Sequence, residues 1–152
     1  MIKEAYEKLA KKHNLPSYNE VNNELEISDI ESEEFLLRHV RKKVSERIES
    51  MASVIGSILQ PSADSLSDMH ECRFFDDKDK GKIVDIYKKL MTFDRVAIEA
   101  DIRQEESADA ALIADFFREL PAIKKDILPF MEKMKTCWKK ETEIEENLEY
   151  FG

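Results

Sequence analysis

The chain of 152 residues contains little glycine, proline or cysteine, and each shortage excludes a class of protein. Three glycines and four prolines are too few for a collagen-like chain or a Pro/Gly-rich disordered one. Three glycines also cannot build the Gly-rich loops that bind nucleotide phosphates. Two cysteines, Cys72 and Cys137, cannot form a disulfide scaffold.

Long apolar runs are absent as well. No segment approaches the roughly 18 consecutive apolar residues of a membrane span. The first 13 residues contain no apolar stretch typical of a secretory signal. Together with two unpaired thiols, these features predict a soluble cytoplasmic protein that does not use a membrane.

Positive charge is also in short supply. The chain has 24 basic and 33 acidic residues, a formal net charge of -9. This balance argues against a protein whose main role is to coat nucleic acid, because such binding depends on neutralising phosphates. One segment departs from the average: residues 118–140 carry seven basic and three acidic side chains. The following residues, 141–150, carry five glutamates and no basic residue.

What the sequence does contain is helix-forming residues at helical spacing. We expect an all-α fold, a single-domain bundle of five to six helices over residues 1–140. Residues 141–152 form an acidic tail, in which Ile144, Leu148 and Phe151 are spaced for a short amphipathic helix. A long helix over about 33–59 is predicted to pack on a central buried helix over about 82–103, which is apolar on two faces.

Several residues predict where helices begin and end. Ser17 and Glu20 have the spacing of a capping box. Ser32 is a candidate N-cap for the long helix, and Asp79 for the central one. Pro121 stands where a new helix would begin, and Pro129 is expected to kink or split that helix.

The motifs of common enzymes and metal sites are missing. The sequence contains no H-E-x-x-H, C-x-x-C or G-x-S-x-G, so we expect no cofactor. His70 and Cys72, which flank Glu71, are weak candidates for metal ligands, and an ordinary helix surface explains them better. Glu46 and Glu49 form an E-x-x-E pair of the kind that holds Mg²⁺ in all-α nucleotide hydrolases. The second acidic motif of such enzymes has no convincing match downstream.

Two basic clusters are the best candidates for binding. The first surrounds the single tryptophan, and the second lies on the long helix. Aromatic and Arg residues are common anchors of interfaces. The candidate contact residues are Trp138, Phe130, Met134, Lys135 and Lys139 in the first cluster, and Arg38, Arg41 and Lys42 in the second.

The sequence therefore favours a non-enzymatic protein that acts through protein–protein contacts, as an adaptor, a complex subunit or a homo-oligomer. The basic face could bind an acidic protein, including the Glu-rich tail of a second copy or of the same chain. Two alternatives remain open at this point. One is an Mg²⁺-dependent nucleotide hydrolase that uses Glu46 and Glu49, and the other is nucleic-acid binding through the basic 124–140 face.

Overall fold

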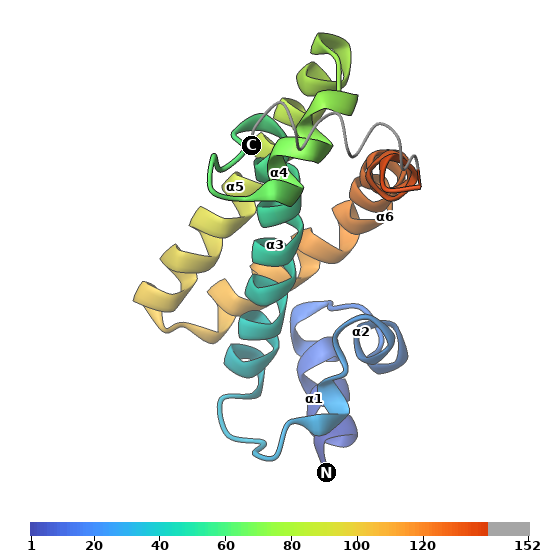
Figure 1. Cartoon of the computed structure of the whole chain (residues 1–152). Coiled ribbons are helices and arrows are strands. Elements are labelled where there is room, and N and C mark those ends of the chain that lie inside the picture. Colours follow the sequence, from blue (N-terminus) through green and yellow to red (C-terminus); the bar gives the residue numbers. More distant parts are fainter. Residues whose placement is uncertain (140–152) are drawn as a thin grey trace. The chain divides into compact units, whose positions relative to one another are not determined.

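The computed structural model describes residues 1–139, and these residues form an all-α fold, as the sequence predicts (Figure 1). The described chain contains six α-helices, within the predicted five to six, together with two short 3-10 helices and no strand. In chain order they are α1 (Ile2–His13), α2 (Tyr18–Leu25), η1 (Ile27–Asp29), α3 (Leu36–Leu59), α4 (Leu66–Glu71), η2 (Cys72–Phe74), α5 (Asp77–Arg103) and α6 (Glu106–Cys137). The predicted acidic tail lies outside the described residues.

The described residues divide into two compact units that share the three long helices. Unit 1 comprises residues 1–50 and 91–121, and unit 2 comprises residues 51–90 together with the described residues from 122 onward. The boundaries fall within α3, within α5 and at Pro121 of α6. Each unit therefore has its own segment of each long helix. The expected single domain over residues 1–140 stays a prediction.

Unit 1 is built around the N-terminal helices. α1 and α2 lie side by side (Figure 1). The side chain of Tyr6, on α1, is fully buried. Its hydroxyl donates a hydrogen bond of 2.8 Å to the carbonyl of Pro16. Burial raises the pKa of this phenol above its ordinary value. α2 begins at the predicted capping box, where the Glu20 amide donates to the hydroxyl of Ser17.

Unit 2 contains the short helices α4 and η2 and has a core of its own. Its buried side chains come from all of its long-helix segments and include Ile55, Ile83, Leu90 and Ile127. Gly56 of α3 faces Tyr87 of α5 so closely that a Cβ at this position would lie 3.2 Å from the ring. The absence of a side chain thus permits close approach of the two helices, as the expected packing of the long helix on the central helix requires.

α3 confirms the predicted apolar stripe but begins later than expected. Leu37, Val40, Val44, Ile48, Ile55 and Ile58 of that stripe are all buried. The helix starts at Leu36 rather than at residue 33, because Phe35 has a left-handed backbone with φ of 53°. Ser32 accepts a hydrogen bond from the amide of Glu34 and so closes a turn before the helix. The Phe35 carbonyl accepts from the amides of the first helical turn.

α5 buries one of its two predicted stripes. Ile83, Ile86, Leu90 and Ala97 of the first stripe are buried. Ile98 and Ile102 of the second stripe are 48% and 77% exposed. Within the described residues, the C-terminal half of α5 thus presents an apolar side to solvent, where the sequence predicted burial.

The start of α5 corrects the predicted cap. The helix begins at Asp77 rather than near residue 82. The Asp79 amide donates to the carboxylate of Asp76 at 2.8 Å, and the Asp76 amide donates to the carboxylate of Asp79 at 3.3 Å. Asp76 is therefore the capping residue, and Asp79 completes a reciprocal capping box.

The predicted break at Pro121 is wrong. α6 is one helix from Glu106 to Cys137 and passes through both Pro121 and Pro129. Both prolines are exposed, so the carbonyls that lose a partner face the solvent side of the helix. The buried residues on the other side, among them Ile113 and Ile123, continue at helical spacing and favour an uninterrupted helix.

No helix within residues 1–139 combines the length and the apolar character needed to cross a membrane.

Candidate interaction surface

A strip of exposed apolar side chains lies on the last three turns of α6 and on the turn residue that follows the helix. Leu128, Met131 and Trp138 are 62%, 38% and 39% exposed. Their spacing of three and seven residues places them on one face of the helix, with Lys135 between them. The strip borders a groove in unit 2, and we call this surface the α6 strip. The groove is lined by Glu71, Leu128, Met131, Glu132, Met134, Lys135 and Trp138.

α4 holds Trp138 in a defined position. The indole Nε1 donates a hydrogen bond of 2.9 Å to the carboxylate of Glu71. The indole also packs on His70, with ring centroids 4.4 Å apart. His70 is buried, and its Nε2 lies 3.3 Å from the carbonyl oxygen of Cys137 at the end of α6. Trp138 therefore offers a partly exposed ring whose orientation is already fixed, which lowers the entropy cost of using it as a contact.

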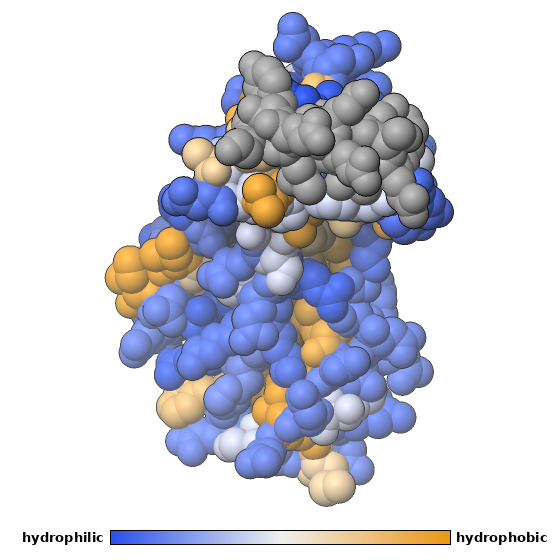
Figure 2. All heavy atoms as spheres, in the orientation of Figure 1, coloured by the Kyte–Doolittle hydropathy of each residue, from blue (hydrophilic) through white to orange (hydrophobic). Residues whose placement is uncertain are grey.

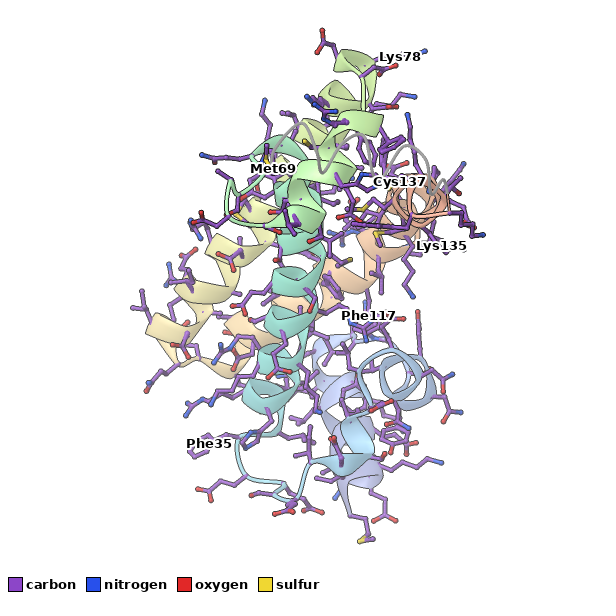
Figure 3. The ribbon with its side chains drawn as sticks, in the orientation of Figure 1. Phe35, Met69, Lys78, Phe117, Lys135 and Cys137 are labelled. Atoms are coloured by element: carbon purple, nitrogen blue, oxygen red, sulfur yellow. The ribbon has the colours of Figure 1, made fainter. Side chains whose placement is uncertain are left out.

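The lysines around the strip have acidic neighbours. Lys135 is exposed on the outer side of α6 (Figure 3), and its Nζ lies 2.7 Å from a carboxylate oxygen of Glu132. This hydrogen bond lowers the pKa of the Glu132 carboxyl below its ordinary value. Lys133 reaches Asp79 on α5 at 2.6 Å and lowers the pKa of that carboxyl in the same way. Part of the positive charge predicted for this face is thus paired with carboxylates within unit 2.

Two predicted contact residues belong to the core instead. Phe130 is 8% exposed and packs near Phe75, with ring centroids 6.1 Å apart. Met134 is 5% exposed and forms the inner wall of the groove. The exposed neighbours that sequence reasoning missed are Leu128 and Met131. The sequence does contain a signal for them, because Leu128 and Met131 each directly follow a residue of the buried apolar face, Ile127 and Phe130. A second apolar stripe beside the buried one indicates apolar side chains left outside the core.

The second predicted cluster divides into three different environments in unit 1. Arg41 is 4% exposed, which corrects its assignment as a surface contact. Its Nε donates to Asp109 at 2.6 Å, and a terminal nitrogen donates to Asp101 at 2.9 Å. Arg38 lies over the ring of Phe35, 4.4 Å from its centroid. Lys42 is exposed on a shallow groove of unit 1.

Asp109 is the partner that buries Arg41. Asp109 as a residue is only 3% exposed. Burial raises the pKa of its carboxyl, although Arg41 acts to lower this pKa. A buried guanidinium needs such partners, because an unpaired charge in the interior is strongly unfavourable. Arg41 is therefore a structural residue of unit 1.

The acidic pair Glu46 and Glu49 lies on the same shallow groove as Lys42. α5 contributes Asp94 and Asp101 to this groove, at positions that no spacing motif had indicated. Asp101 already bonds Arg41, and Asp94 bonds its neighbour Arg95. Among residues 1–139, no three His, Cys, Asp or Glu side chains are grouped so that they could hold a metal ion.

The weak metal candidates on α4 have other contacts. His70 packs on both Trp138 and Phe74. The Cys72 thiol donates to the carbonyl of Met69 at 3.4 Å. These contacts account for both side chains as parts of the fold of unit 2.

Similarity to known proteins does not place this surface in a family. Comparisons with protein-family models, with curated proteins and with solved structures gave no match.

Further exposed apolar side chains occur in unit 1. Ile98 and Ile102 project from α5, and Phe35 is 59% exposed before α3. Figure 2 shows one face of the molecule, on which hydrophobic residues form separate patches within a mainly hydrophilic surface. Single exposed apolar residues are common in folded proteins, whereas the α6 strip also has a fixed aromatic ring and a groove beside it.

Proposed function

We propose that this protein is non-enzymatic and acts through protein–protein contacts made by the α6 strip. The observation that carries the proposal is the exposure of Leu128 and Met131 on one face of α6, together with Trp138 directly after the helix. Large apolar side chains that adjoin a groove are typical of binding surfaces. The fixed position of the indole, between Glu71 and His70, adds the rigidity expected of an anchor.

The chemistry of the strip indicates the kind of partner. An apolar centre with lysines at its edge complements a partner whose own contact face is apolar with acidic flanks. Lys135 lies within the strip, and Lys139 follows one residue after Trp138. The apolar contacts would supply most of the affinity, and the lysines would favour acidic partners over basic ones.

The proposal includes a cytoplasmic setting. The support for it is the presence of two free thiols, Cys72 and Cys137, in the same unit of the fold. Free thiols persist most readily where the compartment is reducing.

The two alternatives have less support from the described side chains. Among residues 1–139, Glu46 and Glu49 belong to no group of three His, Cys, Asp or Glu side chains that could hold a metal ion. On the basic face, Lys133 is already engaged by Asp79 of α5, which reduces the charge available to phosphates.

A capture experiment tests the proposed function. The tagged full chain and a Leu128→Glu/Met131→Glu variant are incubated with lysate of the natural host, with and without nuclease. We expect a stoichiometric protein partner, resistant to nuclease, whose recovery falls at least tenfold in the variant, because two buried charges cost more than about 1.4 kcal/mol at an interface.

Ile98→Glu/Ile102→Glu is the matched control, since it places the same charges on the exposed apolar side of α5. Circular dichroism of both variants verifies that the helices are intact. Equal loss of the partner in both variants, or loss only in the α5 variant, contradicts the proposal. Loss of every partner after nuclease treatment would favour the nucleic-acid alternative.

A further inference from the structure

The α6 strip ends where the undescribed part of the chain begins. Trp138 and Lys139 are the last described residues, and twelve residues, 141–152, follow beyond Lys140. Any occupant supplied by this segment would be tethered directly beside the groove. A short tether gives an effective concentration of about the millimolar range, which favours even a weak intramolecular contact.

The apolar spacing of the strip matches that of the segment. Met131 and Trp138 are seven residues apart, about 10 Å along a helix, and Leu128 extends the strip by one turn. Ile144 and Phe151 are also seven residues apart, with Leu148 between them. Four residues lie between Lys139 and Ile144, which is enough for the chain to reverse direction, since helix–helix connections commonly take two to eight residues.

The charges of the two parts are complementary. Residues 124–139 carry five lysines against two acidic residues. Residues 141–152 carry five glutamates and no basic residue. An antiparallel arrangement would bring glutamates at 141–146 near Lys135 and Lys139, where opposite charges attract.

We propose that residues 141–152 of the same chain dock on the α6 strip, with Ile144 beside Trp138 and Phe151 beside Met131. The segment thereby occupies the surface to which the proposed function assigns the partner, and the partner has to displace it. The proposal rests on that function for its biological meaning, whereas the docking itself can be measured without any partner.

The accessibility of the single tryptophan tests the docking. Acrylamide quenching of Trp138 fluorescence is compared between the full chain and an Ile144→Asp/Leu148→Asp variant. We expect the quenching constant to rise about twofold in the variant, because loss of the docked segment exposes the indole. Thr142→Asp/Asn147→Asp is the matched control, which adds the same charge at polar positions of the segment and is expected to leave quenching unchanged.

Concentration separates the sources of the occupant. A docked segment of the same chain gives quenching that does not depend on protein concentration and a monomeric mass in sedimentation. Protection that appears only at high concentration, together with a dimeric mass, assigns the segment to a second copy and overturns the proposal. Equal quenching in the full chain and in the Ile144→Asp/Leu148→Asp variant also overturns it.

The outcome of this test is distinct from that of the capture experiment. If quenching is unchanged while the Leu128→Glu/Met131→Glu variant still loses its partner, the docking proposal fails and the proposed function stands. If quenching rises but no partner depends on the strip, the docking stands and the proposed function fails. If both stand, partner recovery should increase in the Ile144→Asp/Leu148→Asp variant, because the competing segment no longer covers the strip.

Discussion

Arg41 illustrates how one buried residue can organise a unit of the fold. Its guanidinium is held by Asp109, which is buried, and by Asp101, whose side chain is 63% exposed. The two carboxylates bond the same cation but differ in their access to water. Removing the buried partner leaves a charge that water cannot solvate, whereas water can replace the exposed one.

Asp109→Ala and Asp101→Ala should therefore differ strongly in stability. We expect Asp109→Ala to lower the free energy of unfolding by about 3 kcal/mol, the usual cost of breaking a buried ion pair. Asp101→Ala, which removes the same charge, should cost less than about 1 kcal/mol. Urea denaturation of both variants measures the difference. Equal losses would show that Arg41 does not depend on its buried partner.

At the residue scale, the sequence predicted the kinds of residue that matter better than their surroundings. Trp138 was predicted as a contact residue and is partly exposed beside a groove. Arg41 and Phe130 were predicted for the same role and are buried. Their burial depends on partners distant in the sequence, Asp109 for Arg41 and Phe75 for Phe130, and helical spacing carries no information about such pairs.

The helices themselves could be predicted well, and their ends less well. The apolar stripe of α3 from Leu37 to Ile58 follows from local spacing, and its side chains are buried apart from Met51, which is half-buried. The start of α3 depends on the left-handed backbone of Phe35, a conformation that is uncommon for an aromatic residue and is not signalled by its identity. The continuity of α6 through Pro121 depends on the solvent exposure of that residue, which only the tertiary structure determines.

The capping box of α5 makes a pH-dependent contribution to the stability of unit 2. The hydrogen bond from Lys133 lowers the pKa of Asp79 below its ordinary value of 3.8, and the Asp76 amide acts in the same direction. A lowered pKa in the folded state means that the ionised carboxylate is stabilised by folding. This contribution is present above about pH 4 and is lost as the pH falls through the lower, folded-state pKa.

Asp79→Asn should therefore lower the stability at pH 7 by about 0.5–1 kcal/mol, the size of a capping interaction. The difference from the natural chain should shrink as the pH falls from 4 toward 2, because Asp79 becomes protonated as the pH passes below its lowered pKa. Thermal unfolding followed from pH 2 to pH 7 measures both values. Asp77→Asn removes the same charge from an exposed neighbour outside the box and provides the control. A difference between Asp79→Asn and the natural chain that persists unchanged at pH 2 would contradict this assignment.

At the scale of the whole molecule, the two units share their helices rather than being joined by linkers. α3, α5 and α6 each contribute one segment to each unit. Each unit holds only part of each of these helices, and an isolated helical segment of about 10 to 15 residues is only marginally stable in water without its packing partners. Loss of order in one unit should therefore destabilise the other through the shared helices.

This sharing predicts one cooperative unfolding transition. Trp138 is the single tryptophan and reports on unit 2, whereas far-UV ellipticity reports on all helices. We expect the two signals to coincide during urea denaturation, and Asp109→Ala in unit 1 to shift both midpoints equally. A tryptophan midpoint that does not move, beside a biphasic ellipticity curve, would show that the units unfold independently.

The two free thiols differ in how far the fold shields them. Cys137 is 1% exposed at the end of α6, and its thiol donates to the carbonyl of Met134 at 2.9 Å. Cys72 is only half-buried. A thiol reagent therefore modifies Cys72 in the folded protein, but it reaches Cys137 only when the last turn of α6 opens. The ratio of the two modification rates gives the fraction of molecules in which that turn is open, and the chain needs no introduced label for the measurement.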